Sequence, residues 1–182
     1  CALPILAEQW GAQGLMVLPP MRYKADDEET VAYFTTIANS TDLPIMIYNN
    51  PVDYKIMVTL DMFEQLAACK NITAIKESTR DVTNVTRLIN RFGDRYKILC
   101  GVDPLALEEL VTGACGWVAG LVCAFPRETV ALYALVKAGR IKEALEIYRW
   151  FMPLLELDIH PKLVQYIKLD RKSTRLNSSH LV

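Results

Sequence analysis

Two polar side chains stand at the ends of two successive apolar segments of this sequence. Lys76 closes the segment 71–78, and Tyr48 closes the segment 44–51, one βα unit earlier. If both segments are parallel strands, an amine and a phenol emerge at the same edge of a sheet. Such a pair can trap a carbonyl as an imine and move protons, as covalent aldolase-type catalysis requires. The same pattern also fits a surface or ion-paired lysine and a core tyrosine that satisfies a backbone group.

Alternation along a strand gives the expected direction of both side chains. It places Lys76 on the face of Ile72 and Ala74, and Tyr48 on the face of Met46. Lysine is disfavoured in buried parallel strands, so an amine at this position needs an explanation. Apolar surroundings favour the neutral, nucleophilic form of an amine. A lysine activated by burial is therefore one interpretation of the pattern, beside the surface or ion-paired lysine.

The elements around these residues alternate between short apolar runs and amphipathic segments. Helix signals include an apolar stripe over 31–37, an N-cap at Asp81 with a closing Gly93, and an apolar face over 141–157. The acidic run 26–29 is interpreted as a helix N-terminus rather than a metal site, because it complements the helix dipole. The predicted strands begin near Leu15, Ile45, Ile72, Lys97 and Trp117.

Five βα units without an antiparallel hairpin fit either a doubly wound sheet or part of a (β/α)8 barrel. No glycine-rich nucleotide loop follows any predicted strand, whereas Tyr48, Lys76 and Gly101 all stand at strand carboxyl ends, where a barrel builds its site. We predict an α/β fold: the C-terminal part, about five βα units, of a TIM (β/α)8 barrel, with trailing helices from about residue 141. Three further units are expected upstream.

Three ordered motifs carry a family resemblance. Tyr48-Asn-Asn-Pro51, Ile75-Lys-Glu77 and Cys100-Gly-Val-Asp103 make residues 1–169 similar to the dihydrodipicolinate synthase and N-acetylneuraminate lyase family. The resemblance implies that Lys76 forms a Schiff base with a small-molecule 2-oxo acid and that Tyr48 shuttles protons. It also implies substrate-binding positions at Gly101 and Val118, no cofactor, no metal, and a parent that is a homotetramer or homodimer.

Two departures from the family pattern narrow the expected reaction. Synthases of this family carry a tyrosine pair where this sequence has Pro19-Pro-Met21, and an arginine where it has Asp53. The resemblance is therefore strongest to the 2-keto-3-deoxy sugar acid dehydratases and the pyrroline-4-hydroxy-2-carboxylate deaminase, which lead to 2-oxoglutarate semialdehyde. The alternatives are a dihydrodipicolinate synthase or another aldolase of the family, and, outside this class, a non-catalytic binding barrel or a non-functional fragment.

Residues 170–182 are expected to be foreign to the protein. Positions 170–180 resemble the in-frame translation of a widely used sequencing adapter. The other end opens at Cys1 without an initiator methionine, so both ends are expected to be cut, and the fragment alone is expected to be inactive. The predicted domain is then residues 1–169, a truncated barrel.

Composition excludes several classes of function. Without residues 170–182 the formal charge falls from −1 to −3, which leaves no basic field for nucleic acid. The longest uncharged run, 111–126, is interrupted by glycines and is too short for a membrane helix. Five scattered cysteines without a Cys-x-x-Cys pair favour a reducing cytoplasm, and Cys100 is interpreted as a buried strand residue. His160 alone remains outside the tail, which argues against a histidine-based metal site or hydrolase.

Overall fold

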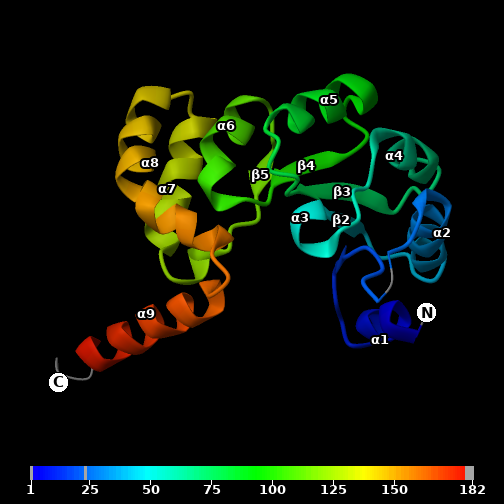
Figure 1. The fold of residues 1–182 in the computed structure, drawn as a ribbon, viewed down its shortest axis with the longest axis horizontal. Coiled ribbons are helices and arrows are strands. Elements are labelled where there is room, and N and C mark those ends of the chain that lie inside the picture. Colours follow the sequence, from blue (N-terminus) through cyan, green and yellow to red (C-terminus); the bar gives the residue numbers. More distant parts are fainter. Residues whose placement is uncertain (1, 23, 179–182) are drawn as a thin grey trace. The chain divides into compact units, whose positions relative to one another are not determined.

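The computed structural model describes residues 2–22 and 24–178 (Figure 1). The chain folds as two compact units. The first unit consists of the residues up to Leu99 together with Thr112–Cys115, and the second consists of Cys100–Val111 and the chain from Gly116 onwards. Each unit has its own helices and hydrogen bonds.

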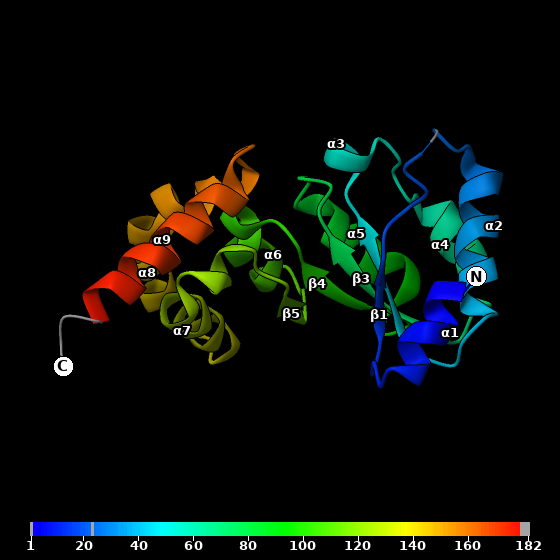
Figure 2. The same cartoon turned by 90° about the horizontal axis from the view of Figure 1, so that it is seen from below.

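The first unit contains the elements that carry Tyr48 and Lys76. Its helices α2 and α4 pack side by side (Figure 2). Its strands are β1 (Leu15–Val17), β2 (Ile45–Asn49), β3 (Ile72–Glu77) and all but the last residue of β4 (Lys97–Cys100). Its helices are α1 (Ala2–Gln9), α2 (Asp27–Ala38), α3 (Pro51–Tyr54), α4 (Leu60–Leu66) and α5 (Thr83–Phe92).

The second unit is mainly helical, and α7 and α8 lie against each other in it (Figure 1). Its helices are α6 (Ala106–Val111), α7 (Pro126–Lys137), α8 (Ile141–Leu155) and α9 (Leu163–Ser178). Shorter elements are β5 (Gly116–Trp117) and the 3-10 turns η1 (Asp103–Leu105), η2 (Leu121–Cys123) and η3 (Glu156–Ile159).

The strands follow one another in the order of the sequence, β1-β2-β3-β4-β5. The pairs β1-β2 and β2-β3 are parallel. Within the first unit, the Cys115 amide donates to the Ile98 carbonyl at 2.8 Å, and within the second, the Val118 amide donates to the Cys100 carbonyl at 2.8 Å. All five strands begin at or beside the predicted positions, so the repeating βα units are confirmed.

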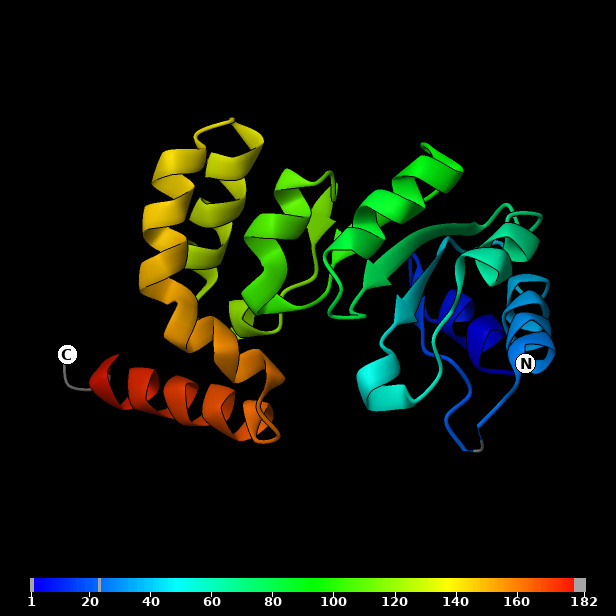
Figure 3. The same ribbon diagram turned by 45° about the horizontal axis from the view of Figure 1, so that its top comes forward.

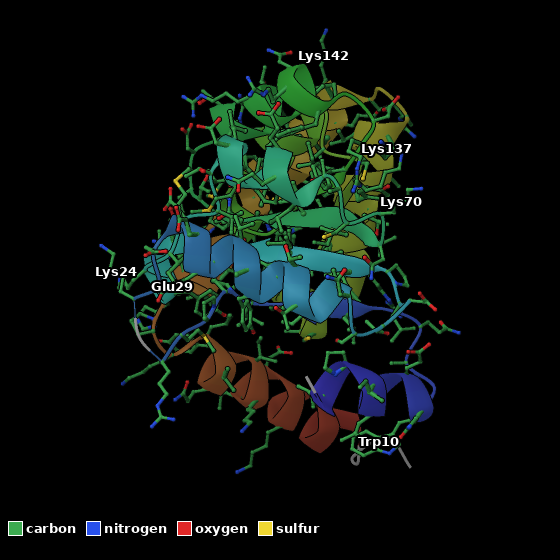
Figure 4. All side chains as sticks on the ribbon, turned by 90° about the vertical axis from the view of Figure 1, so that its right-hand side faces the viewer. Trp10, Lys24, Glu29, Lys70, Lys137 and Lys142 are labelled. Atoms are coloured by element: carbon green, nitrogen blue, oxygen red, sulfur yellow. The ribbon has the colours of Figure 1, made fainter. Side chains whose placement is uncertain are left out.

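Burial explains why these segments become strands and helices. Ile47 and Ile75 are fully buried on one face of the sheet, and Phe34, Phe63 and Leu66 of α2 and α4 are buried as well. Each of these side chains gains about 1.5–3 kcal/mol from leaving water. Not every apolar side chain is buried: Trp10, directly after α1, is 76% exposed and points into solvent (Figure 4).

Helix ends agree with the sequence. Asp26 and Glu29 form a capping box at α2, in which each side chain accepts from the other residue's backbone amide at 2.8 and 3.0 Å. The acidic run is therefore a helix N-terminus. At α5 the predicted N-cap was wrong: Val82 occupies the N-cap position without a side-chain cap bond, and Asp81, one residue earlier, accepts from the Thr83 amide at 3.0 Å. Gly93 follows the end of α5 with a φ of 55°, as predicted.

Helix α9 extends beyond the predicted end of the apolar pattern at Leu169. It continues to Ser178 and thus includes residues 170–178 of the adapter-like segment, whereas 179–182 lie outside the described residues. Helical conformation does not reveal the origin of this segment, so its foreign origin stays a prediction. Within residues 2–22 and 24–178, no helix has both the length and the apolar character needed to cross a bilayer.

Candidate functional site

Tyr48 and Lys76 occupy paired positions of the parallel strands β2 and β3. Side chains at paired positions leave the sheet on the same side. Both are half-buried, whereas Asn49 and Glu77, the next pair along the strands, are fully buried on the opposite face. The predicted proximity of the amine and the phenol is therefore present in the structure.

A bulge in β3 corrects one expectation about this face. Ile45 pairs with Ile72, but the next residue, Met46, pairs with Ala74, so Thr73 is an extra residue in β3. Ala74 shares the face of Lys76, as predicted. Ile72 is fully buried on the other face beside Ile45, so its predicted placement with Lys76 was wrong. Strict alternation of side chains fails here because the extra residue, Thr73, puts Ile72 on the opposite face from the one that alternation predicts.

The Lys76 amine lies over the face of the Tyr48 ring, with Nζ 3.9 Å from the ring centre. At this distance the ring quadrupole attracts the ammonium form. The edge of Tyr54 contacts the same ring, with centroids 5.5 Å apart and ring planes at 81°. Burial raises the pKa of Tyr54, and the neighbouring Tyr48 and Asp53 raise it further. The Tyr48 ring thus contacts both the Lys76 amine and the Tyr54 ring.

The hydroxyl of Tyr48 lies in a hydrogen-bonded group at the start of α3, the short helix after β2 (Figure 3). Asn50 Nδ2 donates to Tyr48 Oη at 3.2 Å and to Asp53 Oδ2 at 2.7 Å. Asn50 Oδ1 accepts from the Asp53 amide at 3.2 Å and so caps the helix. Sequence analysis singled out Asp53 as a departure but missed Asn50, whose role depends on this geometry.

On the opposite face of the sheet, side chains at the ends of β2 and β3 hold the backbone in place. The Asn49 side chain forms two hydrogen bonds with the backbone of Val58. Its Nδ2 donates to the Val58 carbonyl at 3.1 Å, and its Oδ1 accepts from the Val58 amide at 3.0 Å. Glu77 accepts from the Thr79 amide at 2.7 Å and from Asn84 Nδ2 at 2.8 Å. Burial raises the pKa of Glu77, and these donors oppose that rise. The residues beside Tyr48 and Lys76 are therefore rigidly held.

Gly101 and Val118 belong to the second unit. Gly101 is buried directly after β4, and the Val118 amide donates to the carbonyl of Cys100, the residue before Gly101. The structure thus brings Gly101 close to Val118 and, in the other unit, Tyr48 close to Lys76. The predicted substrate-binding roles of Gly101 and Val118 remain predictions.

Asp103 is a buried carboxylate in the second unit that sequence reasoning did not select. It accepts from Trp117 Nε1 at 2.9 Å, the Gly120 amide at 3.1 Å and the Leu121 amide at 2.6 Å. Burial, followed by the nearby Asp158 carboxylate, raises the pKa of Asp103 to about 6. Asp103 therefore anchors the segment that contains Val118. Nothing in the sequence pointed to these partners.

Cys100 is fully buried, and burial raises the pKa of its thiol. A buried thiol of this kind is a weak nucleophile, so the interpretation of Cys100 as a core strand residue is confirmed. Among the described residues, no group of three or more His, Cys, Asp or Glu side chains is arranged to hold a metal ion.

Comparison with known proteins decides the family. Residues 2–182 match the Dihydrodipicolinate synthetase family. The chain belongs to this family. The relatives include the 4-hydroxy-tetrahydrodipicolinate synthase of Aquifex aeolicus, 31% identical over 83% of this chain, and that of Exiguobacterium sibiricum, 32% identical over 85%. These alignments cover 52% and 54% of the relatives, so the chain spans about half the length of the curated relatives it matches.

Solved structures of the dihydrodipicolinate synthetase family share the fold. The crystal structure of dihydrodipicolinate synthase from Aquifex aeolicus superposes with a TM-score of 0.83 and 30% identity, over 88% of this chain and 56% of that one. A putative dihydrodipicolinate synthetase from Pseudomonas aeruginosa gives a TM-score of 0.90 and 29% identity, over 95% and 60%. The predicted fold class, α/β and part of a (β/α)8 barrel, is confirmed by these matches and by the parallel strands.

Proposed function

We propose that the protein to which this chain belongs is a Schiff-base-forming lyase that acts on a 2-oxo acid or a cyclic imino acid. The observation that carries the proposal is the placement of the Lys76 amine 3.9 Å from the Tyr48 ring, at paired ends of adjacent strands. Lys76 is the proposed nucleophile and Tyr48 the proposed proton shuttle. Membership of the dihydrodipicolinate synthetase family supports this assignment.

The proposed chemistry begins with attack of the neutral Lys76 amine on the 2-carbonyl carbon. Proton transfers through Tyr48 release the carbonyl oxygen as water and leave an iminium ion. The iminium acts as an electron sink, so loss of a C3 proton gives an enamine. The enamine can then expel a 4-hydroxyl group, which leaves as water after taking a proton. The C3=C4 double bond then moves to C4=C5 as C5 loses a proton and C3 gains one, which gives the enol of the C5 aldehyde. Hydrolysis of the iminium finally frees Lys76.

Within this chemistry we propose elimination, by dehydration or deamination toward 2-oxoglutarate semialdehyde, rather than condensation. Asp53 places a carboxylate 2.7 Å from the Asn50 amide that bonds Tyr48. A carboxylate at this point repels the carboxylate of a substrate such as aspartate semialdehyde, which a cation would bind. Pro19-Pro-Met21 supplies no phenol to assist condensation. Substrates with a 4-hydroxyl group or a ring imine carry no carboxylate at this end.

The second candidate is a synthase, because the relatives at 31% and 32% identity are named 4-hydroxy-tetrahydrodipicolinate synthase. A direct comparison separates the candidates. The full-length protein is given a 2-keto-3-deoxypentonate, pyrroline-4-hydroxy-2-carboxylate, or pyruvate with aspartate semialdehyde. Semialdehyde is followed with a coupled dehydrogenase, and ammonia is measured in parallel. Elimination faster than condensation supports the proposal, and ammonia release identifies a deaminase. Faster condensation overturns the proposed reaction.

Borohydride trapping tests the mechanism itself. Reduction in the presence of pyruvate should attach the substrate carbons to Lys76, because imine formation needs only the 2-oxo acid. Mass spectrometry that places the adduct elsewhere, or finds none, refutes the mechanism and favours a non-catalytic barrel. We further propose a homotetrameric or homodimeric parent in the cytoplasm and an inactive isolated fragment; size-exclusion chromatography with light scattering measures the assembly.

A further inference from the structure

We infer that Asp53 acts through Asn50 to hold Tyr48 as a hydrogen-bond donor toward the reacting centre. Asn50 and Asp53 are thus positioning residues, and neither has to touch the substrate. The inference rests on the proposed function, because it requires Tyr48 to be the proton shuttle. It starts from three hydrogen bonds that converge on one amide side chain.

Two contacts with Asp53 fix the orientation of the Asn50 amide. An amide side chain can usually be turned over, because its oxygen and nitrogen have similar shapes. Here an ionised carboxylate can only accept, so it requires the nitrogen at its 2.7 Å contact. The Asp53 backbone amide can only donate, so it requires the oxygen at its 3.2 Å contact. Both requirements select the same orientation.

This orientation determines the direction of the Tyr48 hydroxyl hydrogen. The second N–H of Asn50 points to Tyr48 Oη at 3.2 Å, so the phenol oxygen accepts this bond. A phenol has one hydrogen, which is then left to donate elsewhere. The donated bond also stabilises the negative charge that develops on the oxygen when its proton leaves. Tyr48 therefore enters the reaction ready to give a proton.

The Asn50 side chain makes more hydrogen bonds than a helix cap requires. A cap needs only the side-chain oxygen, and serine, threonine or aspartate supply one as well as asparagine does. The two N–H groups of Asn50 are additional, and both are used. Asn50 is 5% exposed, so these bonds form in surroundings where a hydrogen bond is stronger than in water. The amide nitrogen therefore has a role separate from capping α3.

Two measurements with pyruvate separate the amount of imine at equilibrium, which does not depend on how fast Tyr48 moves protons, from the rate of proton transfer at C3. In the full-length protein, borohydride trapping measures the imine on Lys76. In D2O, incorporation of deuterium at C3 measures enamine formation, because a C3 proton leaves and a deuteron returns. The exchange needs no second substrate and no net oxidation. A residue that orients Tyr48 should change exchange far more than trapping.

Three variants provide the comparison. Asn50→Ser keeps an acceptor for the cap but removes both amide donors. Asp53→Asn keeps the side-chain size and removes one of the two contacts that fix the Asn50 amide, while the backbone contact remains. Thr59→Ala is the matched control: Thr59 Oγ1 caps α4 by accepting from the Met62 amide at 3.3 Å, in a cap that includes neither Tyr48 nor Asn50. We expect Asn50→Ser to retain trapping within about twofold and lose about tenfold in exchange, with Asp53→Asn intermediate.

Thr59→Ala should lower the melting temperature and leave the ratio of exchange to trapping unchanged. Wild-type exchange in Asn50→Ser would overturn the inference, and so would parallel losses of both rates in Asn50→Ser and Thr59→Ala, which indicate a folding defect. Wild-type exchange in Asp53→Asn would remove Asp53 from the inferred pair. Failure of the wild-type protein to form any adduct would instead refute the proposed function.

Discussion

The Lys76 amine lies over the ring of Tyr48, and the Tyr48 hydroxyl oxygen accepts a hydrogen bond from Asn50. The ring therefore carries the lysine amine on its face and a hydrogen-bond donor at its oxygen. This arrangement separates the tasks of the pair, because the amine can react with a carbonyl carbon while the hydroxyl remains bonded. The first prediction follows from this separation.

Lys76→Ala should abolish the borohydride adduct with pyruvate, because no amine remains at this position. Tyr48→Phe should still form the adduct slowly and lose about two to four decades of turnover, since only the proton shuttle is removed. Trapping by mass spectrometry and steady-state rates of the full-length protein measure both effects. Equal loss of adduct in the two variants would assign Tyr48 a structural role.

Asp53→Arg should move the preference toward aldehydes that carry a carboxylate. A guanidinium can bind a carboxylate through two charge-assisted bonds where the wild-type side chain repels it. We expect the ratio of condensation to elimination to rise about tenfold, which corresponds to roughly 1.4 kcal/mol. Asp42→Arg, an exposed position before β2, is the charge-matched control and should leave the ratio unchanged. Similar changes in both variants would point to net charge alone.

Asp103 predicts a specific pH dependence of stability. Its pKa is raised from 3.8 to about 6 in the folded protein, so the folded state binds the proton more tightly than the unfolded state. Between pH 4 and 6 the folded state then carries more protons, and the free energy of unfolding falls as the pH rises, by up to about 3 kcal/mol. Above pH 6 this contribution is constant.

Urea titrations of the wild-type chain and of Asp103→Ala, at pH values from 4 to 7, measure this contribution. The alanine variant loses the acceptor of three donors and should be less stable throughout. Its difference from wild type should be largest at the acidic end of the range. A difference that grows toward pH 7 would show that Asp103 is stabilised as the carboxylate.

Deletion of residues 170–182 should change the free energy of unfolding by about 0.5 kcal/mol or less. Residues 171–177 contain six polar or charged side chains and no apolar period, although α9 continues through them to Ser178. Thermal denaturation of the full and shortened chains makes the comparison. A strong loss of stability would show that this segment is native to the fold.

The strands, the helix starts and the proximity of Tyr48 to Lys76 could be predicted because each depends on local sequence. Apolar runs set the strands, and strands of a parallel sheet end at a common edge. Asp103 and its partners could not be predicted, because Trp117 and Leu121 come 14 and 18 residues later and meet it only through the tertiary fold. The role of Asn50 could not be predicted because it depends on the orientation of its side-chain amide in the folded protein.

The extra residue in β3 has a consequence for comparing sequences of this family. Thr73 lies between the positions that pair with Ile45 and Met46, so a relative that lacks this residue can keep Lys76 opposite Tyr48. An alignment gap at Thr73 would then be structurally correct, whereas a gap after Ala74 would displace the lysine from its partner. Loss of a residue at Thr73 therefore leaves the pairing of Lys76 with Tyr48 unchanged, whereas loss of a residue between Ala74 and Lys76 disrupts it.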